Sequence, residues 1–186
     1  TVYAWFRDAA GLVSTSAATD SVFLDRTAPT LSAASLNGGA TYANSLSVSM
    51  GFTASDTGGS GLSQVCMSTT AGSPQGGCAA YANPAPFTFS AGEGTRTLYV
   101  QVRDVANNLT AVASDSIIID TTRPTGTVSL AAGAAAVNTT GITYTVSAAD
   151  TNGVASMCVR ESPSTQPAAN DPCFVTYSTA ATAISL

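Results

Sequence analysis

Apolar and polar residues alternate with a period of two over several short segments of the chain. Apolar residues occupy every second position from Leu46 to Phe52 and again from Leu98 to Val102. This alternation predicts strands with one buried face, and clusters of Gly, Asn, Pro and Ser separate them. No segment has a clear helical period. We therefore predict an all-β fold, with strands near residues 30–36, 46–54, 64–68, 78–81, 86–90, 97–103 and 111–119.

The same segments recur along the 186 residues of the chain. Thr1–Asp8 matches Thr97–Asp104 at an offset of 96 residues, and Asp25–Thr30 matches Asp120–Thr125 at an offset of 95. A period of about 95 residues is typical of one β-sandwich domain. The repeat predicts three parts: a hairpin with a hinge at 1–26, a complete repeat at 27–121, and the first strands of a further repeat at 122–186.

The ends of the chain align with positions inside a repeat. Thr1 aligns with Thr97, and Leu186 aligns near Phe89 to Ala91. The sequence is then either a window on a tandem array, or a chain whose residues 1–24 complete the sandwich of a neighbouring copy. An arbitrary fragment is the plain alternative. We expect residues 1–24 to be detached from the complete domain or paired with a neighbour, so the expected partners are adjoining repeats or copies of the chain.

Four cysteines form two pairs, with 11 residues between Cys66 and Cys78 and 14 between Cys158 and Cys173. Zinc sites need closely spaced Cys-x-x-Cys pairs, and the chain has none. An even count at related spacing favours two disulfides over free or metal-bound thiols. Disulfides persist in oxidising compartments, so the sequence predicts an extracellular location.

Composition removes many kinds of chemistry. The chain has no His and its six basic residues are all Arg, which excludes a Ser-His-Asp triad, His-ligated zinc, a Schiff-base or P-loop lysine, and Lys–Asn isopeptide bonds. A net charge of −5 argues against nucleic-acid binding. The longest apolar stretch, residues 130–137, is far shorter than the roughly 20 residues of a membrane span. A carboxylate pair for glycoside hydrolysis is possible in principle, but most Asp residues fall in repeated turns or hinges, so we expect no enzyme.

Three motifs resemble a known family. The Asp25-Arg-Thr-Ala-Pro-Thr30 hinge, the Leu98–Asp104 strand and the Asp104-Val-Ala-Asn-Asn108 turn together resemble bacterial immunoglobulin-like (Ig-like) repeat domains of large secreted adhesins and surface fibres. The resemblance covers the chain as one complete and two partial repeats, and its cysteine pairs depart from the commonest form. It implies tandem Ig-like β-sandwiches joined by short hinges, which proline stiffens by fixing φ.

Several carboxylates are candidates for a metal site. In an Ig-like topology the hinge and two of the loops lie at one pole, which brings carboxylates together at each repeat junction. Oxygen ligands without His or Cys suit Ca²⁺, the single candidate cofactor, and the resembled repeats bind calcium at such junctions. The alternatives are Asx turns and pairing with Arg26 or Arg103. The candidate ligands are Asp25, Asp56 and Asp104 at the first junction and Asp120 and Asp150 at the second.

Two weaker signals remain. Asn108-Leu-Thr110 and Asn138-Thr-Thr140 fit the N-glycosylation sequon, although such triplets arise easily by chance in a Thr-rich chain. Aromatic residues near the N-terminus predict an interface with a neighbouring domain or copy, or a platform for a sugar. The predicted interface residues are Thr1, Tyr3, Trp5 and Phe6.

These observations predict an extracellular structural or adhesive filament or stalk built from Ig-like repeats. Each sandwich would be completed by the adjoining repeat or by a neighbouring copy. The alternative is a ligand- or carbohydrate-binding accessory module of a secreted protein. An exposed aromatic patch would favour that alternative, and an aromatic content of 7% weakens it.

Overall fold

The computed structural model describes residues 1–72, 74–161 and 165–185; residues 73, 162–164 and 186 fall within the predicted repeats but lie outside this description. The described residues form strands and two short 3₁₀ helices, and no α-helix occurs among them, which confirms the predicted all-β class. None of their helices is long and apolar enough to cross a membrane. The elements are β1 (Val2–Ala4), β2 (Ala18–Asp20), β3 (Thr30–Leu36), β4 (Tyr42–Ala43), β5 (Ser47–Ser55), β6 (Leu62–Ser68), η1 (Pro74–Gly77), β7 (Cys78–Ala80), β8 (Ala85–Thr88), β9 (Gly94–Asp104), β10 (Ala113–Ile119), β11 (Thr125–Leu130), η2 (Ala131–Gly133), β12 (Gly141–Ala149), β13 (Ser156–Met157), β14 (Val175–Thr176) and β15 (Thr182–Ser185).

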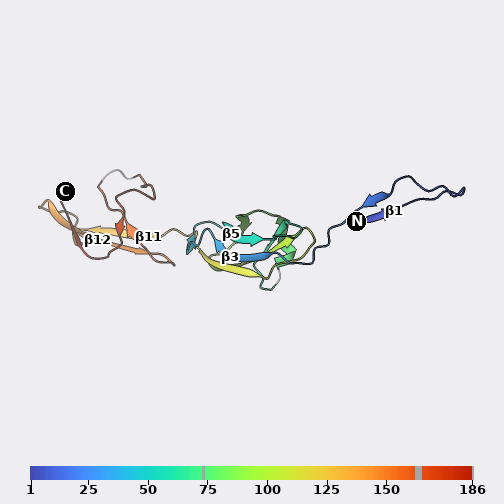
Figure 1. The fold of residues 1–186 in the computed structure, drawn as a ribbon. Coiled ribbons are helices and arrows are strands. Elements are labelled where there is room, and N and C mark those ends of the chain that lie inside the picture. Colours follow the sequence, from blue (N-terminus) through green and yellow to red (C-terminus); the bar gives the residue numbers. More distant parts are fainter. Residues whose placement is uncertain (73, 162–164, 186) are drawn as a thin grey trace. The chain divides into compact units, whose positions relative to one another are not determined.

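The chain divides into two compact units, Thr1–Ile119 and Asp120–Leu186. In the first unit, two sheets lie within residues 30–119 (Figure 1). One sheet has three strands in the order β3-β5-β8, and the other has five in the order β4-β10-β9-β6-β7. All of these pairings are antiparallel except that of β4 with β10.

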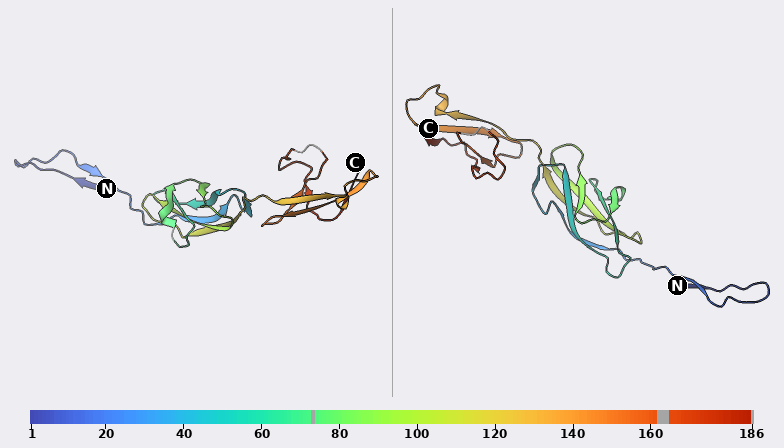
Figure 2. Two further views of the ribbon diagram at one scale, coloured as in Figure 1. Left: turned by 180° about the vertical axis from the view of Figure 1, so that it is seen from behind. Right: turned by 90° about the horizontal axis from the view of Figure 1, so that it is seen from above.

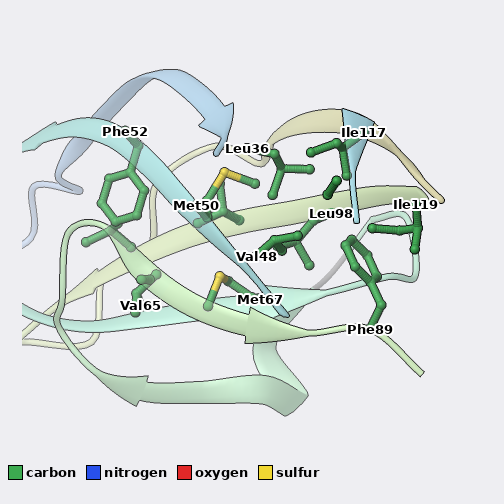
Figure 3. Packing of buried hydrophobic residues seen from close by; sticks show 14 residues of the cluster. Leu36, Val48, Met50, Phe52, Val65, Met67, Phe89, Leu98, Ile117 and Ile119 are labelled. Carbon is green, nitrogen blue, oxygen red and sulfur yellow. The ribbon is translucent and has the colours of Figure 1, made fainter. Parts of the chain in front are cut away.

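Both sheets contribute side chains to one buried hydrophobic cluster (Figure 3). Alternation along β5 buries Val48, Met50 and Phe52, and alternation along β9 buries Leu98 and Val102. Burying such a side chain stabilises the fold by roughly 1.5–3 kcal/mol relative to leaving it exposed. The cluster therefore accounts for the period-two pattern in the sequence. Its other buried members are Leu36, Ala43, Val65, Met67, Ala85, Phe89, Val100, Ile117 and Ile119.

The outer face of the five-stranded sheet carries polar residues that are also buried. Gln101 lies opposite Cys66 in the β6–β9 pairing and is 8% exposed. Its amide Nε2 donates to the carbonyl of Thr110 at 2.7 Å, and the hydroxyl of Thr110 accepts from the backbone N–H of Val102 at 3.0 Å. Alternation alone suggests an exposed glutamine at this position, but the segment after β9 folds back and covers it.

The second unit contains a three-stranded sheet, β11-β12-β15, and a separate two-stranded pairing of β13 with β14. Figure 2 shows the strands of this unit in orange and red. Along β12 the side chains alternate between exposed and half-buried or buried positions, as they do along β5. Ile142, at 8% exposure, is the one buried hydrophobic residue among the described residues of this unit. The apolar side chains of this unit are thus more exposed to solvent than those of the two sheets within residues 30–119.

The first 24 residues form a hairpin in which β1 pairs antiparallel with β2, with Val2 opposite Asp20 and Ala4 opposite Ala18. Beyond the strands, the backbone N–H of Ser14 donates to the carbonyl of Phe6 at 2.8 Å. The large apolar side chains of the hairpin are exposed to solvent. They are Val2, Tyr3, Trp5, Phe6, Leu12, Val13, Val22, Phe23 and Leu24.

Candidate functional site

Three loops of the first unit bring three carboxylates together. Asp25 belongs to the hinge before β3, Asp56 follows β5, and Asp104 ends β9. One carboxylate oxygen from each lies within 4.8 Å of the others. We call these three residues the junction cluster. The repeat and the expected loop positions predicted this grouping, and the structure places the three side chains side by side.

Asp104 is the most enclosed member of the junction cluster, at 0% exposure. Its Oδ1 accepts from the backbone N–H of Asn108 and its Oδ2 accepts from the Nδ2 of Asn108, both at 2.8 Å. The backbone N–H of Asp104 in turn donates to the carbonyl of Asn108 at 3.1 Å. Asp104 thus holds the turn after β9 closed with both carboxylate oxygens.

Asp25 fastens the hinge to the loop after β5. Its Oδ2 accepts from the backbone N–H of Ser60 at 2.6 Å, and its Oδ1 accepts from that of Thr27 at 3.0 Å. Hydrogen bonds from the hydroxyl of Ser60, then from the backbone N–H groups of Thr27 and Ser60, lower the pKa of Asp25. Donors of this kind stabilise the ionised form, so Asp25 keeps its negative charge beside two other carboxylates.

Asp56 shapes the third loop. Its Oδ2 accepts from the backbone N–H of Gly61 at 2.7 Å, and its carbonyl accepts from that of Gly59 at 3.2 Å. This is the turn role that Asp commonly has in a Gly-rich loop. Gly61 has a φ of +93°, a backbone conformation that favours glycine.

Further hydrogen bonds join the three loops to one another. The backbone N–H of Val105 donates to the carbonyl of Gly61 at 3.0 Å, and that of Ala106 donates to the hydroxyl of Ser60 at 3.0 Å. The Nδ2 of Asn108 also reaches the carbonyl of Asp25 at 3.4 Å. Residues of the hinge, the loop after β5 and the turn after β9 therefore form a single bonded node.

The junction cluster has the chemistry of a hard-cation site. Ca²⁺ binds oxygen ligands at 2.3–2.6 Å, so two of its ligands can lie up to roughly 5 Å apart, which accommodates the 4.8 Å limit here. The alternatives were Asx turns, a role that Asp56 has here, and neutralisation by arginine. Among the described residues, no arginine makes an ion pair with the cluster: Arg103 donates to the Oε1 of Gln64 at 3.2 Å, and Arg26 is exposed.

At the second junction, each candidate ligand accepts a hydrogen bond from its own loop. The Oδ1 of Asp120 accepts from the backbone N–H of Thr122 at 3.2 Å, and the Oδ1 of Asp150 accepts from that of Asn152 at 2.9 Å. The other oxygen of Asp150, Oδ2, is buried without a hydrogen-bond partner. Among the described residues, the junction cluster is the one group of three such side chains within 4.8 Å of one another, so Asp120 and Asp150 belong to no such group.

Both predicted disulfides are confirmed. Cys66 bonds Cys78 across the β6–β7 pairing, with a Cα–Cα distance of 3.9 Å, and Cys158 bonds Cys173 at 5.1 Å. No described cysteine is free. Cys66 lies in β6 and Cys158 directly follows β13, and each bonds a cysteine in the segment that follows, so each disulfide closes a short loop.

The two sequon asparagines differ in their surroundings. The Nδ2 of Asn108, the atom that would carry a glycan, donates to Asp104 and to the carbonyl of Asp25 in the bonded node. Asn138 is exposed in the segment between η2 and β12. Asn108 thus has a structural role in the turn, whereas Asn138 is the accessible one of the two.

The predicted interface residues Thr1, Tyr3, Trp5 and Phe6 are all exposed. The rings of Tyr3 and Trp5 stack, with centroids 6.1 Å apart and an interplanar angle of 25°. Tyr3 and Trp5 are each 59% exposed, and Phe6 is 66% exposed. The hairpin thus presents aromatic surface that the described structure leaves uncovered.

Two features of the site were not predicted from the sequence. Ser60 links the hinge to both other loops through its N–H and hydroxyl, but within Asp56–Gly61 it looks like an ordinary loop serine. Asn108 was predicted as a turn residue. Its position four residues after Asp104 is the one feature of the sequence that hints at its two hydrogen bonds to the Asp104 carboxylate. No family model and no curated protein sequence matches the chain.

Proposed function

We propose that the chain is part of an extracellular structural or adhesive filament or stalk built from tandem Ig-like β-sandwiches. The observation that carries the proposal is the repeat of about 95 residues, whose aligned segments occupy corresponding strands in the two units. β3, β5 and β6 correspond in sequence to β11, β12 and β13. The disulfides of the two units join equivalent cysteines.

The Ig-like identity is supported by how the sheets share one core. A three-stranded and a five-stranded sheet, both mostly antiparallel, contribute facing side chains to a single cluster, as in a β-sandwich. Two disulfides fit an oxidising extracellular compartment. A stalk built from such sandwiches does not require a catalytic centre.

The bonded node fixes the hinge of the proposed stalk. Asp25 lies in the hinge that precedes the complete repeat, and its bonds to Ser60 and Thr27 fix that hinge to the repeat. Pro29, in the same hinge, is buried and has a fixed φ. Calcium held by the junction cluster would stiffen the hinge further by bridging all three loops.

Location tests this proposal directly. Antibodies raised against the full chain should label intact, unpermeabilised cells that make the protein, and protease added outside the cells should remove the label. Labelling that requires permeabilised cells would contradict an extracellular role.

A second function, carbohydrate binding, is favoured by the exposed stack of Tyr3 and Trp5. Stacked, solvent-facing aromatic rings can serve as a platform for a sugar ring. Trp5 is the sole tryptophan, so its fluorescence reports this surface without interference. If this function is correct, titration with a set of soluble oligosaccharides should shift the emission of Trp5 for at least one sugar. The Trp5→Ala variant should not bind that sugar. Unchanged emission with every sugar would exclude carbohydrate binding at this surface.

A further inference from the structure

The loop between η2 and β12 contains the sequon Asn138-Thr139-Thr140. All three of its residues are exposed, and none of them belongs to a strand. An N-linked glycan is bulky and hydrophilic, so the asparagine that carries it has to lie on a surface loop of the folded protein. Asn138 meets both requirements, since it lies in a loop and faces solvent.

The exposure of Asn138 is a property of the repeat rather than of one unit. Asn44 aligns with Asn138 at the offset of 94 residues that matches the start of β5 with the start of β12, and Asn44 is also exposed. The same local hydrogen bond follows each asparagine: the backbone N–H three residues later donates to the hydroxyl of the residue directly after the asparagine, at 3.1 Å and 3.3 Å respectively. The complete repeat, with both of its sheets in place, therefore leaves this position open to solvent.

The complete repeat lacks a sequon at the aligned position. Asn44 is followed by Ser45 and Leu46, so the third residue of the triplet has no hydroxyl. Leu46 is partly buried and packs against the core instead. Its aligned residue in the second unit is Thr140, which is exposed. The acceptor triplet is thus complete at this position in the second unit alone.

The surroundings of Asn138 carry no charge. Residues 124–149 contain no Asp, Glu, Lys or Arg, and residues 131–137 are Ala, Gly and Val only. Residues 132–137 are all exposed. Charged side chains normally keep such a surface soluble and prevent its association with other apolar surfaces. A glycan at the end of this uncharged segment would supply the hydrophilic surface that its own side chains lack.

The other sequon, which begins at Asn108, has its acceptor nitrogen occupied. The Nδ2 of Asn108 donates to the Oδ2 of Asp104 at 2.8 Å and to the carbonyl of Asp25 at 3.4 Å. A glycan replaces one of the two hydrogens on this nitrogen, so it would remove one of these bonds and place a sugar among the loops of the bonded node. The Thr110 of the same sequon is 4% exposed, and its hydroxyl accepts from the backbone N–H of Val102. The folded repeat therefore opposes a glycan on Asn108.

We propose that Asn138 carries an N-linked glycan and that Asn108 carries none, an inference that rests on the proposed extracellular location because the glycan is added to proteins during export. The donor is an oligosaccharide joined to a lipid through a diphosphate. The Nδ2 of Asn138 forms a bond to the anomeric carbon of the first sugar, and the bond from that carbon to the diphosphate oxygen breaks. The proton lost from Nδ2 leaves with the lipid diphosphate. The attached glycan covers the uncharged segment beside it.

Peptide mapping of the protein purified from the cells that make it tests this inference. Cleavage before Asp separates the two sequons, because it gives one peptide of residues 104–114 and another of residues 120–149. The mass of the second peptide should exceed its sequence mass by that of an oligosaccharide. Release of the glycan by an amidase in heavy-oxygen water should then leave a labelled aspartate at position 138. A second peptide of unmodified mass, or a glycan on the first peptide, would overturn the inference.

Two neighbouring threonines provide a matched pair of variants. Thr140→Ala destroys the sequon but keeps Asn138, whereas Thr139→Ala keeps the sequon. Both threonines are exposed, so both variants should fold. On a denaturing gel, Thr139→Ala should migrate with the wild-type protein and Thr140→Ala should migrate faster by the mass of the glycan. Equal migration of the two variants would contradict an N-linked glycan at Asn138.

Cell-surface labelling of the same cells separates the failure of this inference from the failure of the proposed function. An unmodified Asn138 in protein that is labelled on intact cells would overturn the glycan and leave the extracellular stalk standing. An unmodified protein that is found only inside the cells would overturn both.

Discussion

Replacement of Asp104 by alanine should have an effect on stability that depends on calcium. The change removes two hydrogen bonds from Asn108 to a carboxylate, each worth about 1.5–3 kcal/mol. It also removes repulsion between Asp104 and the other two carboxylates. The carboxylate oxygens lie within 4.8 Å of one another, so relief of this repulsion offsets part of the loss of the hydrogen bonds.

The two effects have opposite signs when no cation is present. In the presence of a chelator, Asp104→Ala should therefore lower the free energy of unfolding of the complete repeat by less than the roughly 3–6 kcal/mol of the two hydrogen bonds alone. A bound cation removes the repulsion and adds a contact that the variant lacks. At a calcium concentration 100 times the dissociation constant, the wild-type protein gains about 2.7 kcal/mol, so the cost of the substitution should rise by about that amount.

Urea denaturation of the full chain, followed by circular dichroism with and without calcium, measures this difference. Hydrogen exchange of β6 and β9 assigns the change to the complete repeat. Asp115→Ala is the matched control, because the Oδ2 of Asp115 accepts from the backbone N–H of Leu36 at 2.7 Å and Asp115 is not part of the junction cluster. The control should lose the same stability in both buffers. An equal cost for Asp104→Ala with and without calcium would refute the assignment of a cation to the cluster.

Two further perturbations test other parts of the structure. Because hydrogen bonds lower the pKa of Asp25 in the folded protein, the stabilising effect of its carboxylate is present above the unfolded pKa of 3.8 and is lost as the pH falls through the folded pKa. The wild-type protein should therefore be more stable than Asp25→Asn at pH 7, and the difference should vanish near pH 2. Acid titrations of both proteins that show a constant difference in stability would contradict this cause. Replacement of Cys66 and Cys78 together by alanine should lower the free energy of unfolding by about 3 kcal/mol, since their bond closes a loop with a sequence separation of 12. The Tm of the complete repeat should then fall by at least roughly 10 °C. A shift within a degree or two in calorimetry would mean that the bond constrains the unfolded chain very little.

Much of the fold of the complete repeat could be predicted from alternation and turn residues. The predicted strand at 30–36 coincides with β3, and the predicted strand at 46–54 differs from β5 by one residue at each end. β4 was missed because two residues are too few to show a period. Its position is fixed instead by its parallel pairing with the end of β10, a contact between segments far apart in the sequence.

The candidate site was predictable in its members but not in its bonding. The internal repeat and the common pole of the loops in an Ig-like topology were enough to place Asp25, Asp56 and Asp104 together. The donors could not be predicted, because backbone N–H groups such as that of Ser60 have no sequence signature. The burial of Gln101 was missed for a related reason: its covering partner, Thr110, reaches it only after the chain has turned back over the sheet.

The partial exposure of apolar side chains in the second unit could not be predicted from their alternation. Alternation along β12 predicts which side chains face inward, but it does not predict whether another strand covers them. Comparison of equivalent positions within one chain supplies that information, since the same pattern is buried at Phe52 and half-buried at Val146.

Electron microscopy of the native material tests the central proposal of a filament of Ig-like repeats most directly. The longest strand, β9, has 11 residues and spans about 36 Å at the rise of a β-strand, so one repeat should advance the filament by roughly 40 Å. Fibres or stalks with a regular axial spacing near this value are the predicted result. Isolated particles with the mass of one chain and no periodic spacing would contradict the account.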